Sequence, residues 1–408
     1  MKQIYEAEVV EMLQNGSGVL VDTRSSHAFI GWKMEGEPKE GHIKGATDFS
    51  ADWLTAGKQP ELGVWLYEKL SFRKITSSTK VVLYDYTGKH AGAVEAYMRT
   101  QGIEDISYFC LKDWNGEMEY YPEYWRLVPP CWVKDLIEGK NPEHYIGKGF
   151  KIFHTYWGPT DERYLDGHIP GAVHIDTEEF EVGPEWIRTP DEELEKFAFA
   201  NGITTDTTVI IYGDGDAKLN TVLQYMGVER VCLINGGFRA WVRAGYPLET
   251  IDNPKESVEC FGAKVPAKPD FIMDIDEVKS ILLDGAKGAV YDIRTWSQFI
   301  GADSGYEYVF KAGRLPNSIW CFDPHFYTNP DGTMENKEEM LELWRKRGVD
   351  FSVRNGFFCG SASWGGARIE IYAQVAGIPN ILMYEGGWVQ WQLDPNNPYE
   401  VGTPEKFQ

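Results

Sequence analysis

One cysteine in this 408-residue sequence stands where its thiol could act as a nucleophile. Cys359 follows the apolar run Asn355-Gly356-Phe357-Phe358 and precedes Gly360-Ser361-Ala362-Ser363-Trp364-Gly365-Gly366, after which a helical pattern begins. Small residues let several backbone amides turn toward one atom, and the N-terminus of the next helix adds its dipole. Such amides stabilise a thiolate, a persulfide or an oxyanion and lower a cysteine pKa from its usual value of about 8.5. We therefore predict that Cys359 is catalytic and that residues 360–365 bind its substrate.

A second pair of charged residues is expected near this cysteine. Asp292 and Arg294 end another short apolar strand, and the loop after Cys359 contains no Lys or Arg before Arg368. The pair could be a buried ion pair that ties the strand end to the next helix, or Arg294 could contact an anionic substrate. Arg294 is included among the predicted substrate-binding residues. The hydroxyls of Ser361 and Ser363 are candidate donors to a bound oxyanion.

The chain contains three related copies of one pattern. Each copy has a Gly-[His/Arg]-[Ile/Leu] segment, at Gly41-His42-Ile43, Gly167-His168-Ile169 and Gly313-Arg314-Leu315. An apolar run follows, and the residue after it lies 44, 46 and 46 positions beyond the first glycine, at Asp85, Gly213 and Cys359. The second and third copies close with a glycine pair followed by Trp241 or Trp391. Only the third copy therefore carries a nucleophile at the shared position.

Short apolar runs alternate with helical patterns in every copy, which predicts an α/β fold with parallel sheets flanked by helices on both faces. Expected helices include residues 91–101, 219–226 and 367–376. Changes in composition place the boundaries near Val128-Pro129-Pro130 and within 252–269. The sequence thus predicts three domains: 1–127 and 128–255, both inactive, and 256–408, which is catalytic.

Composition excludes several classes of partner. The formal net charge of −22 repels phosphate backbones and anionic lipid surfaces, so neither nucleic acid nor a membrane is an expected partner. The remaining cysteines, Cys110, Cys131, Cys232, Cys260 and Cys321, are scattered singly and are interpreted as structural thiols. The first residues do not form a signal peptide, so a cytoplasmic location is expected, unless a leader has been removed. No metal and no cofactor are predicted.

These motifs, in this order and with these spacings, resemble the rhodanese family of sulfurtransferases over nearly the whole chain. The resemblance implies three tandem rhodanese-like domains, two of which have lost the cysteine. It also implies that Cys359 takes a sulfane sulfur from thiosulfate or a persulfide and passes it to cyanide or a thiol, in two covalent steps. The expected substrates are small sulfur-containing anions or thiols, and a protein could be the acceptor.

The sequence departs from the family in the loop. Related proteins place an Arg or Lys there, whereas Gly365 follows Trp364 in this chain. Thiosulfate would then depend on amides, on Arg294 or on a residue from another domain. Two alternatives stay open. The protein could be a sulfur carrier or binding module without turnover, or a cysteine-dependent phosphatase or arsenate reductase, although Gly365 stands where the phosphatase arginine would be.

Overall fold

The computed structural model describes residues 1–405 and contains three related parallel sheets. The first has the order β1-β6-β5-β2-β4, the second β10-β9-β13-β14-β8, and the third β16-β15-β17-β18. The strands of the first sheet are Lys2–Gln3 (β1), Val19–Asp22 (β2), Thr47–Asp48 (β4), Val81–Asp85 (β5) and Ile106–Cys110 (β6). Those of the second are Leu127–Val128 (β8), Phe150–Tyr156 (β9), Ala172–Asp176 (β10), Thr208–Gly213 (β13) and Arg230–Ile234 (β14). Those of the third are Ala289–Asp292 (β15), Ile319–Trp320 (β16), Asn355–Phe358 (β17) and Ile381–Met383 (β18), and Met273 adds one parallel bridge to Tyr384.

Helices connect the strands of each sheet. The first sheet is accompanied by Glu6–Asn15 (α1), Ser26–Ile30 (α2), Glu61–Phe72 (α3) and Lys89–Thr100 (α4). The second has Pro130–Ile137 (α5), Glu162–Leu165 (α6), Asp191–Ala200 (α7), Asp216–Met226 (α8) and Gly237–Arg243 (α9). The third has Ile275–Leu283 (α10), Trp296–Phe299 (α11), Lys337–Lys346 (α12), Trp364–Ala376 (α13) and Gly387–Leu393 (α14). Two antiparallel pairs, His42–Ile43 (β3) with Met118–Glu119 (β7) and Glu181–Val182 (β11) with Ile187–Arg188 (β12), complete the strands.

Alternation along the central strands explains why both sheet faces are covered. In the first sheet Leu83 packs in one apolar cluster, while its neighbours Val82 and Tyr84 pack in another. Successive side chains of a strand point to opposite faces, so each face requires its own layer of helices. The α/β class with parallel sheets flanked by helices is confirmed.

The strand register aligns the three copies residue by residue. Asp22 lies opposite Tyr84, His154 opposite Tyr212, and Asp292 opposite Phe358. The second copy therefore has His154 where the other two have an aspartate. Asp85, Gly213 and Cys359 follow or end equivalent central strands.

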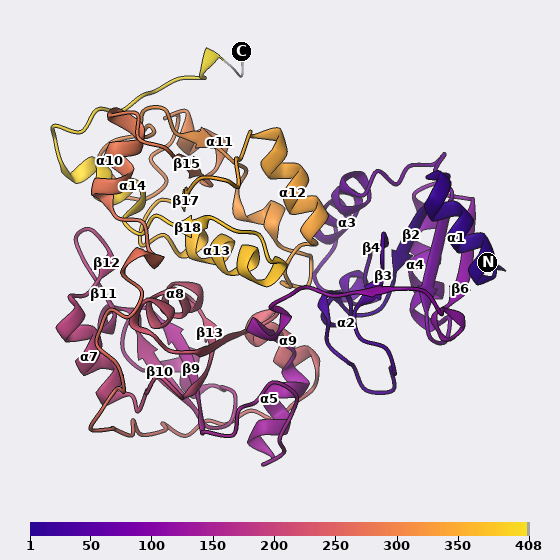
Figure 1. The fold of residues 1–408 in the computed structure, drawn as a ribbon, viewed down its shortest axis with the longest axis horizontal. Helices are drawn as coiled ribbons and strands as arrows, with labels where there is room; N and C mark the ends of the chain where they lie inside the picture. Colours follow the sequence, from indigo (N-terminus) through magenta and orange to yellow (C-terminus); the bar gives the residue numbers. More distant parts are fainter. Residues whose placement is uncertain (406–408) are drawn as a thin grey trace. The chain divides into compact units, whose positions relative to one another are not determined.

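By contacts the chain forms two compact units. One contains Met1–Tyr124 together with Thr328–Leu341, and the other contains Trp125–Tyr327 and the chain from Glu342 onward. The segment Thr328–Leu341 lies within the predicted third domain, yet it is part of the unit built on the first copy. In the second unit, α8 and α13 pack against each other, and Figure 1 shows them side by side.

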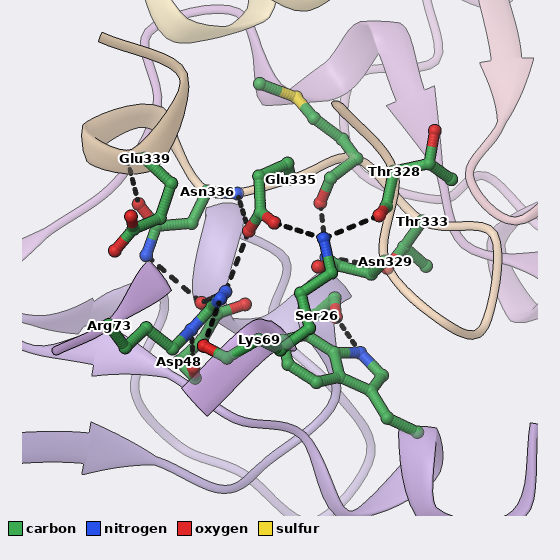
Figure 2. A network of polar contacts seen from close by, with 12 residues as sticks. Ser26, Asp48, Lys69, Arg73, Thr328, Asn329, Thr333, Glu335, Asn336 and Glu339 are labelled. Carbon is green, nitrogen blue, oxygen red and sulfur yellow. Dashed lines mark hydrogen bonds and ion pairs between the residues drawn. The ribbon is translucent and has the colours of Figure 1, made fainter. Parts of the chain in front are cut away.

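Buried charges hold the segment 328–341 in the first unit (Figure 2). Glu335 accepts from Arg73 at 2.7 Å and forms an ion pair with Lys69. Lys69 lies on α3 and Arg73 directly follows it, and both side chains are buried. Lys69 also donates to the carbonyl of Thr328 at 2.7 Å, and Arg73 pairs with Asp48 at 2.6 Å. Two cations and two carboxylates thus satisfy one another inside the first unit.

Candidate active site

The loop between β17 and α13 surrounds the sulfur of Cys359. Ala362 and Ser363 both adopt left-handed backbone conformations with φ of 55°, which bends the chain back toward the cysteine. The N–H groups of Gly365, Ser361 and Gly360 face the sulfur. A Cβ on Gly365 would lie 3.7 Å from Sγ and 2.9 Å from Ile293, so a side chain there would crowd the thiol. The predicted ring of amides is present.

The start of α14 fixes the near end of this loop. The amide of Trp388 donates to the carbonyl of Cys359 at 3.1 Å, and that of Val389 to the carbonyl of Gly360 at 2.9 Å. Gly387 permits this approach, because a Cβ there would lie 2.6 Å from the Cys359 carbonyl oxygen. The glycine pair that closes the copy therefore serves to anchor the cysteine loop.

The pKa of Cys359 differs from the sequence prediction. Burial raises the pKa of the thiol above its usual value, and the nearby carboxylate of Asp292 raises it further. The amides of Gly365, Ser361 and Gly360 act in the opposite direction but do not overcome the burial. The thiol donates to the carbonyl of Ser361 at 3.6 Å. The expectation of a lowered pKa in the resting protein is therefore wrong, because it counted the amides and not the loss of water around the sulfur.

The loop residues predicted to bind substrate divide into two groups. Ser361, Trp364 and Gly365 are partly exposed, as is Cys359 itself. Gly360, Ala362 and Ser363 are buried, and the Ser363 hydroxyl has no hydrogen-bond partner within the described part of the chain. The Trp364 indole N–H donates to both carboxylate oxygens of Glu181 at 3.2 Å.

Arg294 forms the predicted ion pair with Asp292. Its Nη2 donates to Asp292 at 2.6 Å and to the carbonyl of Gly313 at 2.7 Å, and its guanidinium lies 5.0 Å from the Trp388 ring. Nη1 of this buried side chain has no hydrogen-bond partner among residues 1–405. The first copy contains the same pair, but there Nη1 of Arg24 donates to Glu37 at 2.9 Å. Of these two arginines, only the one in the copy with the cysteine therefore has an Nη1 group without a hydrogen-bond partner among the described residues.

The Gly-[His/Arg] motif has a structural role in all three copies. His42 and His168 each lie 3.8 Å from a glutamate, Glu119 and Glu249, and Arg314 lies 2.9 Å from Glu400. Each also packs on an aromatic ring: Phe29, Tyr164 and Phe299, respectively. These contacts give the three residues a bracing role in their turns.

Sequence reasoning missed Tyr306. A Cβ on Gly360 would lie 2.5 Å from the Tyr306 ring, so the ring lies directly over the start of the cysteine loop. Burial and the charge of Cys359 raise the pKa of Tyr306 to about 12, and the ring stacks on that of Tyr308 at 5.2 Å. The available sequence signal was the regular spacing of Tyr306, Tyr308 and Phe310 in a polar segment. All three aromatic side chains are exposed in the structure, and such a cluster often marks a binding surface.

Two side chains of the second copy lie at the site, and the sequence analysis did not predict either of them. Lys218 on α8 is buried and donates to the carbonyl of Ala362 at 2.8 Å. Arg368, the first cation after the loop, pairs with Asp216 on α8 at 2.5 Å. Lys218 of the second copy thus contacts the backbone of the cysteine loop.

The chain matches the model of the rhodanese-like domain over residues 6–115, 159–244 and 274–394. It belongs to the rhodanese-like family. It is 32% identical over 406 residues to the thiosulfate sulfurtransferase YnjE of Escherichia coli K12, covering 96% of this chain and 91% of that protein. The sulfur carrier protein TtuD of Thermus thermophilus is 29% identical over 254 residues, which cover 56% of this chain and 83% of TtuD.

Solved structures of similar rhodanese-like proteins cover nearly the whole chain. Wild-type EanB is 34% identical with a TM-score of 0.90, over 99% of this chain and 98% of that chain. The anaerobic ergothioneine biosynthesis enzyme from Chlorobium limicola, bound to trimethyl histidine, is 33% identical with a TM-score of 0.90, over 99% and 100% of the two chains. The family therefore includes a member that acts on a small histidine derivative as well as one named for thiosulfate. Among the described residues, no helix is long and apolar enough to cross a membrane.

Proposed function

We propose that this protein is a sulfurtransferase that carries a sulfane sulfur as a persulfide on Cys359. In the first step the cysteine sulfur attacks the outer sulfur of the donor. A new S–S bond forms while the donor S–S bond breaks, and the donor leaves as a thiolate or sulfite. In the second step a nucleophilic acceptor takes the terminal sulfur, and the bonding electrons return to Cys359. The thiol proton passes to the departing thiolate or sulfite, which leaves the new persulfide as an anion, so a raised thiol pKa is compatible with the first step.

The observation that carries this proposal lies in the first copy. Asp85, at the position of Cys359, accepts hydrogen bonds from the amides of Thr87 at 2.8 Å and Ala91 at 2.9 Å, and also from that of Gly88. These amides follow Asp85 by two, three and six residues. In the third copy the amides of Ser361 and Gly365 follow the cysteine by two and six residues. The same cradle thus holds an anion in one copy, which supports a persulfide anion in the other.

The charges around the site favour a persulfide donor over thiosulfate. Three cations lie around the site. Arg294 and Arg368 contact the carboxylates of Asp292 and Asp216, whereas Lys218 donates to backbone carbonyls and lies 3.8 Å from Glu181. The two arginines therefore offer little uncompensated positive charge to a dianion, and the Lys218 ammonium group is already held by carbonyl oxygens. Arg294 Nη1 and the loop amides are the donors that remain for a dianion. We propose that these groups, with Ser361, Trp364 and Gly365, contact the substrate.

A histidine derivative is the second candidate acceptor. The exposed Tyr306 and Tyr308 form a stacked aromatic pair beside the cysteine loop. Aromatic faces attract quaternary ammonium groups, so this pair suits a trimethylated amine. EanB structures with hercynine and ergothioneine show that a family member binds such molecules. A thiol, cyanide or an acceptor protein remains the alternative, and the first two copies would then serve recognition.

The persulfide is tested by mass spectrometry. Incubation with a thiol persulfide should add about 32 Da, one sulfur atom, to the peptide that contains Cys359. Cys359→Ser should abolish the addition, whereas Cys260→Ser, at an exposed cysteine, should leave it intact. Absence of an adduct with persulfide, polysulfide and thiosulfate would contradict the proposal.

Measuring the amount of product formed per chain then distinguishes an enzyme from a sulfur carrier. Repeated formation of thiocyanate or of a new persulfide supports an enzyme, while release of one sulfur per chain supports a carrier. Conversion of hercynine to a product heavier by one sulfur would assign the second candidate acceptor. Hydrolysis of an aryl phosphate, the phosphatase alternative, is not expected because Gly365 replaces the arginine that such loops need.

A further inference from the structure

Lys218 reaches the catalytic loop from a copy that has no cysteine of its own at the shared position. It lies in the first turn of α8, five residues after Gly213, just as Trp364 lies five residues after Cys359. Gly213 cannot be replaced readily, because its φ is 114° and a Cβ would lie 2.2 Å from the Thr155 carbonyl oxygen. The second copy has therefore lost the chemistry at this position, although its central strand still leads into a helix, α8, which begins three residues after Gly213. The Lys218 side chain, in the first turn of α8, contacts the cysteine loop of the third copy.

The contacts of the Lys218 ammonium group are mainly with carbonyl oxygens. It donates to Ala362 at 2.8 Å and to Trp186 at 3.2 Å, and its side chain is fully buried. Its carboxylate partner, Glu181, is 3.8 Å away and accepts from the Trp364 indole with both oxygens. Direct contact thus does not neutralise this charge, in contrast to Arg368, which contacts Asp216 at 2.5 Å.

The bond to Ala362 acts where the loop turns. Ala362 is one of the two left-handed residues, so the direction of its carbonyl sets the direction of the peptide that follows. When Lys218 holds this carbonyl away from the sulfur, the amides on the other side of the turn remain directed at it. A buried cation near the loop also favours a negative charge on the sulfur.

We propose that Lys218 of the second copy is a positioning residue for Cys359, which fixes the loop through the Ala362 carbonyl and stabilises the thiolate and persulfide anions. This inference deepens the proposed function, on which it rests. It assigns a task to the second copy: that copy supplies the cation that the catalytic loop lacks.

Several other charged groups act on the same sulfur or on Lys218. Those that face Cys359 are Asp292 on β15 and Tyr306 on the following segment, with Arg294 next to both. Those that face Lys218 are Glu181 on β11, Arg188 on β12, and Glu385 after β18. Burial lowers the pKa of Lys218, and Glu181 and Glu385 raise it. The test must therefore remove the positive charge of Lys218 in one variant and the negative charge of a partner in another, because the two changes should shift the pKa of Cys359 in opposite directions.

The experiment measures the rate of Cys359 alkylation by iodoacetamide against pH in the full chain. Lys218→Met should move the midpoint of the pH–rate profile upward by about one pH unit, which is roughly a tenfold loss of rate below the midpoint. Glu181→Gln removes the opposing carboxylate and should move the midpoint downward. Lys196→Met, at an exposed lysine, should leave the profile unchanged. Circular dichroism checks that each variant is folded.

A purely structural role for Lys218 predicts lower stability with an unchanged midpoint in the folded protein, and that result would overturn the inference. If Lys218→Met does not fold, Glu181→Gln decides alone, and an unmoved or raised midpoint would overturn it. Alkylation does not involve sulfur transfer. Failure of the proposed function would appear instead as a missing persulfide in the wild-type protein, so the two failures are distinguishable.

Discussion

At the scale of single residues, one position takes three forms in the three copies. Asp85 fills the amide cradle of the first copy with its own carboxylate, so no external anion is needed or admitted there. Gly213 sits where a Cβ would strike the Thr155 carbonyl, so the second copy has no room for any side chain. Cys359 has the cradle, and its sulfur faces the amides. The differences at this position therefore have steric and electrostatic causes.

Gly213→Ala should destabilise the protein. The substitution places a Cβ 2.2 Å from a backbone oxygen at a φ of 114°, and neither the strand nor its neighbour can shift easily. We expect a loss of about 3 kcal/mol in the free energy of unfolding, measured by urea denaturation. Gly171→Ala is the matched control: its φ of 77° is also left-handed, but no atom lies within 4 Å of the added Cβ. That variant should lose only about 1 kcal/mol, and equal losses would show that the clash is relieved.

The pKa of Cys359 could not be inferred from the residues near it in sequence. The glycine- and serine-rich loop indicated the amides, which do lower the pKa. Burial depends on Tyr306 and on the packing of the second copy, and neither is encoded in the loop. The sequence thus indicated Cys359 as the candidate nucleophile but gave the wrong direction for the pKa of its resting thiol.

At the scale of elements, the sequence predicted what depends on neighbouring residues. The buried run Val209 to Tyr212 became the core of β13, and the pattern 367–376 became most of α13. These predictions succeeded because periodicity and β-branched content act within a few residues. The pair β11–β12 and the segment around Tyr306 were not predicted. The first contacts the third copy through Glu181 and Arg188, and the second contacts the cysteine loop more than 50 residues later, so neither position follows from local preference.

The position of the segment Thr328–Leu341 also depends on contacts with residues that are distant in sequence. Glu335 meets Lys69 and Arg73, which lie more than 260 positions earlier in the chain. Its two cations hold the pKa of Glu335 below its usual value, although burial opposes them. Glu335→Gln leaves two buried cations short of one negative charge, and we expect a loss of about 3 to 5 kcal/mol in unfolding free energy at pH 7.

The pH dependence identifies the cause of that loss. A carboxylate with a depressed folded-state pKa contributes stability above its unfolded pKa of about 4.3, and the contribution disappears as the pH falls through the folded-state value. The difference between wild type and Glu335→Gln should therefore shrink in acid. Glu338→Gln, an exposed neighbour on α12, should change stability by less than about 0.5 kcal/mol at any pH. A pH-independent loss in Glu335→Gln would indicate a packing defect instead.

At the scale of the molecule, the second and third copies form one unit through the helices that follow their cysteine positions. Thr221 on α8 donates to Glu370 on α13 at 3.1 Å, close to the Arg368–Asp216 pair. The helix after the cysteine loop therefore packs on a copy without a cysteine at the equivalent position. The second copy thus keeps a structural contact with the candidate site, although Gly213 stands at its own cysteine position.

Glu370 makes this packing sensitive to pH. Burial raises the pKa of Glu370 to about 8, so its carboxyl group is protonated in the folded protein at neutral pH. An acid with a raised folded-state pKa costs stability as the pH rises above its unfolded value near 4.3, and the cost stops growing above the folded value. Glu370→Gln keeps a neutral side chain that can accept from Thr221. We expect the variant to match wild type at pH 4 and to exceed it by roughly 3 kcal/mol at pH 7, measured by urea denaturation. A gap that stays constant from pH 4 to pH 7 would show that Glu370 is ionised in the folded protein, and the helix contact would then have to be held by a buried carboxylate.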